Sequence, residues 1–259
     1  EPVLKGNETL SSLKLRVGYG TTGQQDISAQ YDYLRRVTLG TVNTQYVFNG
    51  VVYRTARPEG YNQNIKWEEL AEMNVGVDFG FLNERITGSL NYFDKKSTDL
   101  LADVLVPDGA NLRNQGFNNI GNLRTKGLEF SLQSDVVKND NLTWNVAVNA
   151  TYLDQKIESL GQTVEGFQGY EVGDNIQGGN GNKILINTVG YAPNSFFVYE
   201  QLYDANKKPI AGAYVDRNGD GKIDASDRYR YKKPTADYTF GLFSTLNYKK
   251  FDFTMNWRA

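Results

Sequence analysis

The stretch from residue 74 to residue 94 reads NVGVDFGFLNERITGSLNYFD. Apolar residues alternate with polar or small ones up to Phe81, and the alternation resumes after the segment 82–84. A period of two puts alternate side chains on opposite faces of an extended strand, so each half predicts a strand with one apolar face. Two such strands joined by a short polar turn predict a β-hairpin.

The same pattern recurs in two further pairs of segments. One pair spans 128–152 with its turn at 136–141, and the other spans 238–257 with its turn at 249–250. Residues 13–19 alternate in the same way and predict a seventh strand. The turns inside the hairpins are short, whereas the connections between hairpins, about 97–126 and 154–236, are long and polar.

Outer-membrane β-barrels combine strands of roughly 9 to 11 residues with short periplasmic turns and long extracellular loops. We therefore predict an all-β fold, a portion of an antiparallel transmembrane β-barrel. Eight apolar residues are expected to face lipid: Val75, Val77, Phe79, Leu90, Val146, Val148, Leu242 and Phe253. Eight aromatic residues near strand ends are expected to form the interfacial girdle: Tyr19, Phe81, Tyr92, Tyr152, Tyr238, Tyr248, Phe251 and Trp257. The alternative is a soluble β-sandwich, in which the same apolar side chains fill a core between two sheets.

Composition argues against several classes of function. The 259 residues carry a formal net charge of −2, and the Lys and Arg residues form no basic stripe, so we expect no nucleic-acid partner. The sequence has no Cys and no His, which removes thiolate metal sites and the commonest general base. Glu68 and Glu69 are adjacent, and on a strand they point to opposite faces, unlike a glycosidase pair. We expect no enzyme.

Residues 216–227 read DRNGDGKIDASD and match the spacing of a twelve-residue calcium loop. The expected ligands are the side chains of Asp216, Asn218, Asp220, Asp224 and Asp227 and the main-chain carbonyl of Lys222. Position 12 is Asp rather than the longer Glu, so we expect modest affinity for Ca²⁺ and a structural role. The flanking residues read as extended, which is unlike a helix-pair calcium sensor. The alternative is a tight Asp/Asn/Gly turn without a metal.

Aromatic residues gather in the second long connection. Tyr191, Phe196, Phe197 and Tyr199 are candidates for contact with a ligand, because such rings stack on sugars or on other rings. The alternative is that they pack the loop on itself. In the sandwich reading, these rings and the calcium loop would belong to a carbohydrate-binding or adhesive module.

Several segments, in order along nearly the whole chain, together resemble the C-terminal part of the SusC/RagA-type TonB-linked outer-membrane transporters of Bacteroidetes. They are LKLRVGYGTTGQ at 13–24, IKWEE at 65–69, NVGVD at 74–78, NYFDKKSTDLL at 91–101, NIGN at 119–122, KGLEF at 126–130, the loop 216–227 and YKKFD at 248–252.

The resemblance implies a barrel of about 22 strands closed by a plug domain. Residues 1–259 would then be the C-terminal part of that barrel, and the plug and the N-terminal strands are expected to lie outside this sequence. It also implies residence in the outer membrane, energy from the TonB-ExbB-ExbD system through the missing N-terminal part, and a SusD-like surface lipoprotein as partner. The expected function is import of oligosaccharides or peptides.

Overall fold

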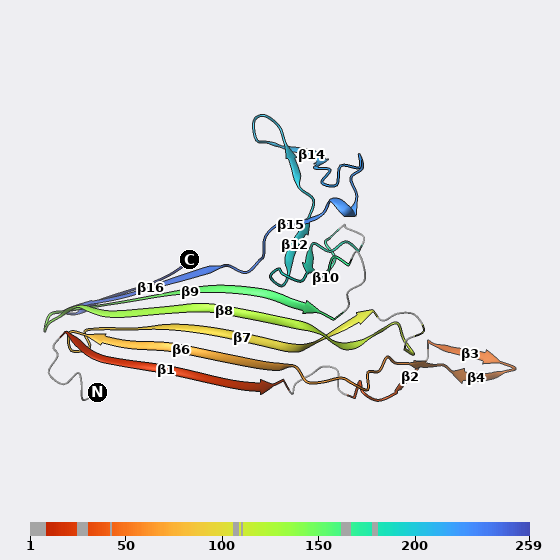
Figure 1. The fold of residues 1–259 in the computed structure, drawn as a ribbon, viewed down its shortest axis with the longest axis horizontal. Helices are drawn as coiled ribbons and strands as arrows, with labels where there is room; N and C mark the ends of the chain where they lie inside the picture. Colours follow the sequence, from red (N-terminus) through yellow and green to blue (C-terminus); the bar gives the residue numbers. More distant parts are fainter. Residues whose placement is uncertain are drawn as a thin grey trace.

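Seven long antiparallel strands form the main sheet of the computed structural model, which describes residues 9–24, 31–41, 43–105, 109, 111–161, 167–177 and 181–259. The strand order is β1-β6-β7-β8-β9-β16-β17, and the strands run side by side (Figure 1). Their bounds are Leu10–Gly23 (β1), Glu69–Phe81 (β6), Ile86–Leu105 (β7), Gln115–Lys138 (β8), Leu142–Leu160 (β9), Tyr238–Tyr248 (β16) and Phe251–Arg258 (β17). The predicted all-β fold, the three hairpins and the additional strand are confirmed.

The short turns lie together at one end of the sheet, at the left of Figure 1, and the long connections lie at the other end. Between β6 and β7, Leu82, Asn83 and Glu84 all have positive φ angles of 53°, 56° and 63°. This left-handed run reverses the chain within three residues. Between β8 and β9, the side-chain oxygen of Asn139 accepts the N–H groups of Asn141 and Leu142.

The register of the sheet separates apolar and polar residues completely in two neighbouring rows. One row of cross-strand partners is apolar throughout: Leu15, Val77, Leu90, Phe130, Ala150 and Phe240. The next row consists of polar residues and glycine: Lys14, Asp78, Ser89, Ser131, Asn149, Gly241 and Arg258. Because side chains alternate between faces, the two rows lie on opposite faces of the sheet.

All eight residues predicted to face lipid share the apolar face. Many side chains on this face are solvent-exposed in the isolated chain, among them Leu15 at 69%, Leu90 at 48% and Phe253 at 60%. Among the described residues the remaining sheets are small and none packs over this face as a sandwich requires. The sandwich alternative is therefore wrong, because it would bury these side chains in a core.

The strands run further than the sequence pattern indicated. Residues 97–126 were expected to be a loop, but β7 continues to Leu105 and β8 starts at Gln115. Past Tyr92 the outward face becomes charged, and the Arg124 guanidinium lies 2.7 Å from Asp94 and 3.5 Å from Glu158. The alternation of apolar and polar residues stops there, while the backbone ladder continues.

The connection 154–236 was also expected to be a loop. It begins with the last residues of the strand β9 and contains further short strands of its own. A four-stranded sheet comprises β10 (Tyr170–Val172), β11 (Leu185–Asn187), β12 (Ser195–Val198) and β15 (Tyr229–Arg230). A hairpin pairs β13 (Gln201–Tyr203) with β14 (Pro209–Tyr214), and η2 (Ala225–Asp227) is a 3-10 turn. Two further small pairs join β2 (Val37–Leu39) to β5 (Ala56–Pro58) and β3 (Gln45–Phe48) to β4 (Val51–Arg54). Within the described part of the chain, no helix has the length and apolar character needed to cross a membrane.

Neighbouring residues on β7 test the assignment of the two faces. In the full-length protein, Leu90→Arg should destabilise the membrane-inserted form by roughly 2–4 kcal/mol, since it puts a guanidinium into hydrocarbon. The measurement is urea unfolding in liposomes. The control Ser89→Arg places the same side chain on the polar face, where the hydroxyls of Ser89 and Ser131 lie 2.8 Å apart. This variant should unfold near the wild-type midpoint. Equal losses in both variants would contradict the assignment.

Candidate functional site

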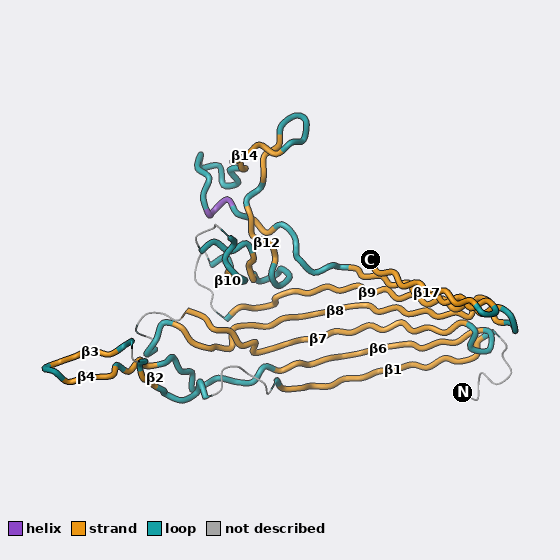
Figure 2. Tube along the Cα trace, turned by 180° about the vertical axis from the view of Figure 1, so that it is seen from behind, coloured by secondary structure: helices purple, strands orange, loops and turns teal. Residues whose placement is uncertain are grey.

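A small unit, the loop module, stands at the end of the main sheet remote from the short turns (Figure 2). We define it as the described residues 167–177 and 181–233. It joins the main sheet through β9, where the Ile157 N–H donates to the carbonyl of Tyr191 at 2.9 Å and the Gly190 N–H donates to that of Ile157 at 2.8 Å. This edge of β9 is available because β16 begins only opposite Tyr152. The module therefore extends the backbone ladder of the sheet.

The module has its own small core. Ile186 and Phe197 are buried, with exposed fractions of 1% and 3%. The guanidinium of Arg228 lies 4.4 Å from the centre of the Phe197 ring and 2.6 Å from the carboxylate of Glu171. Arg230 lies 5.4 Å from the same ring. The two guanidinium groups thus lie over the Phe197 ring, in cation–π contact with it.

The four aromatic ligand candidates have different surroundings. Phe197 belongs to the core, and its ring is not available to a ligand in this structure. Tyr199 is half-buried and packs against Tyr214 with ring centres 5.3 Å apart, while Phe196 is half-buried within β12. Tyr191 differs, since 47% of it is exposed. Packing of the loop on itself thus accounts for three of the four rings.

Tyr191 lines a pocket of about 180 Å³ together with Ala192, Ser195, Arg230, Tyr231, Lys232 and Lys233. Lys233 is paired with Asp237, 2.5 Å away. The pocket gathers three cations and two tyrosine rings. Sequence reasoning missed it, because the run RYRY at 228–231 was read only as an extended flank of the carboxylate loop, and the two lysines that follow it in RYRYKK were not considered. Its dense alternation of cations and tyrosines was the available signal.

The carboxylate loop is organised around Asp227, which is fully buried. One of its oxygens accepts the N–H groups of Arg217 at 2.8 Å and Asn218 at 3.4 Å, and the other accepts that of Asp224 at 2.9 Å. The N–H of Asp224, followed by those of Arg217 and Asn218, lowers the pKa of the Asp227 carboxyl, because hydrogen bonds to a carboxylate favour its charged form.

The other expected calcium ligands also bond to the loop itself. Asp216 accepts the N–H groups of Gly219 and Gly221, both at 2.7 Å, and Asp220 accepts that of Lys222 at 2.8 Å. Across the described residues, no group of three or more Asp, Glu, His or Cys side chains is arranged to hold a metal ion. The contacts are those of a turn closed by Asx hydrogen bonds, the alternative reading of the sequence. Calcium binding stays a prediction.

The polar face of the main sheet carries a second cluster. Arg16 on β1 donates two hydrogen bonds to Asp78 on β6, at 2.8 and 2.6 Å, and one to Asn91 on β7 at 2.7 Å. Gly76 lies beneath them, and a Cβ there would come within 2.3 Å of the Asn91 side-chain oxygen. A hollow of about 420 Å³ lies along this face and is bordered by Asp78. The cluster makes this face suitable as the polar wall of an aqueous lumen.

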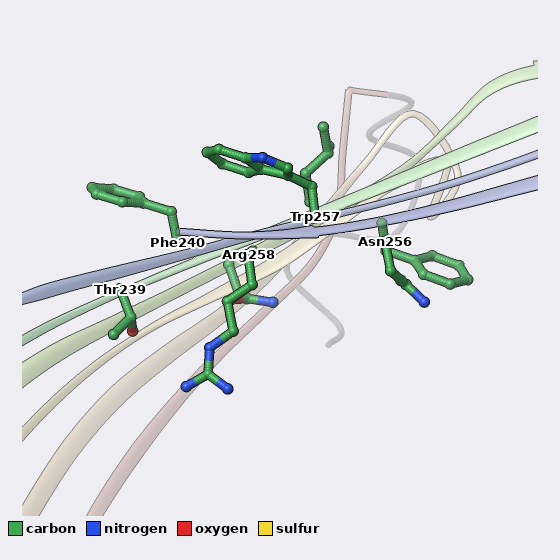
Figure 3. Close-up of a pocket in the computed structure, with 9 residues that line it drawn as sticks. Thr239, Phe240, Asn256, Trp257 and Arg258 are labelled. Carbon is green, nitrogen blue, oxygen red and sulfur yellow. The ribbon is translucent and has the colours of Figure 1, made fainter.

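A further hollow of about 440 Å³ lies at the edge formed by β16 and β17. Figure 3 shows that Phe240 and Trp257 lie on one side of the strands, whereas Thr239, Asn256 and Arg258 lie on the other. These residues therefore belong to opposite faces of the sheet and form no common site.

Comparison with known proteins gives a consistent result. Residues 9–259 match the family described as TonB dependent receptor-like, beta-barrel. The chain is 44% identical over its whole length to TonB-dependent receptor SusC of Bacteroides thetaiotaomicron, of which it covers 26%. It is 32% identical to TonB-dependent receptor P26 of Formosa agariphila, with 98% of this chain and 26% of that protein aligned.

Among solved structures, the chain is similar to the RagAB peptide transporter, with a TM-score of 0.76 and 21% identity. That alignment covers 98% of this chain and 27% of the other. At this identity the likeness concerns the fold. The chain spans about a quarter of the length of the curated relatives described above. The relatives are receptors and transporters, in agreement with the expectation that the chain is no enzyme.

The buried Asp227 predicts a pH dependence confined to its loop. Because the pKa of Asp227 is lowered, the ionised carboxylate stabilises the loop fully at pH values above the ordinary Asp pKa of about 4. This stabilisation is lost as the pH falls from about 4 through the lowered pKa of Asp227. Hydrogen-exchange protection at the N–H groups of Arg217 and Asp224 should fall over that range. Asp227→Asn should remove the protection at neutral pH, whereas the control Asp220→Asn should retain it. Unchanged protection in Asp227→Asn would contradict this assignment.

Calcium binding is tested by calorimetry on the full-length protein stripped with EGTA. A loop that holds Ca²⁺ should give a one-site isotherm with modest affinity, and Asp216→Asn should abolish it because a carboxylate ligand is lost. Lys222→Gln serves as control, since only the main-chain carbonyl of that residue is an expected ligand. The absence of a calcium isotherm in the wild-type protein would leave the loop as a metal-free turn.

Proposed function

This chain belongs to the TonB-dependent receptor-like β-barrel family, and from that premise we propose that it forms part of the wall and the mouth of an outer-membrane importer. The family is one of outer-membrane β-barrels, which agrees with the expected SusC/RagA-type resemblance. The main sheet would face lipid with its apolar side and the lumen with its polar side. The loop module would stand at the extracellular end.

The observation that carries the proposal is the pair of adjacent rows in the sheet. Six consecutive cross-strand partners are apolar from Leu15 to Phe240, while the row beside them runs from Lys14 to Arg258 without an apolar residue. A single-layer sheet with one apolar and one polar face suits a boundary between hydrocarbon and water. The aromatic pair Tyr152 and Tyr238, with ring centres 5.1 Å apart, lies at the limit of the apolar region, where a girdle is expected.

The proposed cargo is an oligosaccharide, or a peptide, captured with a SusD-like surface lipoprotein and imported with energy from the TonB-ExbB-ExbD system. Support comes from the similarity to SusC over the whole chain. The peptide alternative is kept because the structurally similar RagAB is described as a peptide transporter. Energy coupling would act through a plug and an N-terminal segment outside residues 1–259.

The test combines fractionation with uptake in the source cell. An antibody against this chain should detect an outer-membrane protein several times heavier than the chain itself, and a SusD-like lipoprotein should co-purify with it. Cells should accumulate labelled oligosaccharides, and both deletion of the gene and a protonophore should abolish this uptake. A soluble band, or uptake that persists in the deletion strain, would contradict the proposal.

A further inference from the structure

We propose that the cation-lined pocket of the loop module binds the carboxylate of a uronic acid residue in an acidic oligosaccharide. The pocket is the one lined by Tyr191, Ser195, Arg230, Tyr231, Lys232 and their neighbours. This inference rests on the proposed import function and names the class of cargo for it.

The charge of the pocket is only partly compensated. Lys233 is paired with Asp237, but within the described residues neither Arg230 nor Lys232 has a carboxylate partner. Arg230 donates instead to neutral acceptors, the Gln168 carbonyl at 2.6 Å and the Thr188 hydroxyl at 3.1 Å. Two uncompensated positive charges in a concave site attract an anion.

Arg230 is held in place before any ligand arrives. Besides its two hydrogen bonds, its guanidinium lies 5.4 Å from the ring centres of both Tyr191 and Phe197. A guanidinium whose orientation is fixed loses little conformational entropy when it binds a carboxylate, and it presents its donors in a planar fork that matches the two oxygens. Lys232, whose ammonium lies 5.1 Å from the Tyr231 ring centre, adds a second charge at the exposed side.

The size and the aromatic lining favour a sugar ring. A volume of about 180 Å³ is smaller than the roughly 300–1,000 Å³ of sites for drug-sized ligands, and it suits one monosaccharide unit. Tyr191 and Tyr231 are 47% and 55% exposed, so their rings are available to stack on the apolar face of a pyranose.

A peptide fits this site less well. Peptides commonly bind by adding a strand to a sheet edge, which requires open backbone groups. Here the Tyr231 N–H donates to the Phe196 carbonyl at 2.9 Å, and the Lys232 carbonyl accepts the Phe196 N–H at 2.7 Å. These two backbone groups of residues 231 and 232 are thus already used within the module, and the recognition proposed here falls to the side chains.

The experiment is calorimetry with the purified full-length transporter, using trigalacturonate, a neutral galactose trisaccharide and a triglutamate peptide. Trigalacturonate should bind at least about tenfold more tightly than the neutral sugar, with an affinity that falls as salt rises. Lys232→Gln should weaken the binding of trigalacturonate about three- to tenfold, and Lys232→Arg should restore it. Lys232 is exposed, so the substitution leaves the packing of the module intact. Lys208→Gln, at another exposed lysine of the module, is the matched control and should bind as the wild type.

Three results would overturn the inference. These are equal affinity for the charged and the neutral trisaccharide, equal losses in Lys232→Gln and Lys208→Gln, and binding of the peptide in place of trigalacturonate. None of these results would contradict the proposed import function. That proposal is contradicted by a different result, the absence of energy-dependent uptake through the protein in cells.

Discussion

The structure depends on one constraint, the need of every backbone N–H and C=O group in hydrocarbon for a partner within the protein. The five inner strands of the sheet meet it on both sides, and β1 and β17 meet it on one side, through antiparallel ladders that run almost without interruption. The ladder fixes the register, and the register assigns each side chain to a face. A slip by one residue would move Val77 to the polar face and Asp78 to the apolar face, so the sequence alternation and the hydrogen bonds specify the same pairing.

The ladder continues beyond the apolar region, and this extension positions the loop module. Past Tyr92 and Tyr152 the outward side chains are charged, and Arg124 links Asp94 on β7 to Glu158 on β9. These partly buried ion pairs accompany a backbone ladder that continues across the three strands. At its end Ile157 bonds to the segment 190–191. The module is therefore attached to β9 through backbone hydrogen bonds.

Sequence alone predicted the parts of the structure where side-chain alternation and backbone geometry agree. The hairpin around Leu82 and the faces of Val77 and Leu90 follow from a period of two. The extension of β7 and β8 did not follow, because Lys96 and Arg124 interrupt the apolar pattern although the backbone remains paired. The pocket was also missed. Tyr191 and Lys232 are distant in sequence and meet only because Phe196 pairs with residues 231 and 232.

A single-layer sheet has no core between layers, so its side chains must pack sideways across strands on each face. The Phe93 ring lies over Gly127 on the polar face, and the Phe79 ring lies over Gly88 on the apolar face. A Cβ at Gly127 would meet the Phe93 ring at 2.4 Å, and one at Gly88 would meet the Phe79 ring at 2.6 Å. Each glycine thus makes room for an aromatic ring from the neighbouring strand. Because these contacts and the ladder lie within the sheet, the wall holds together without the loop module.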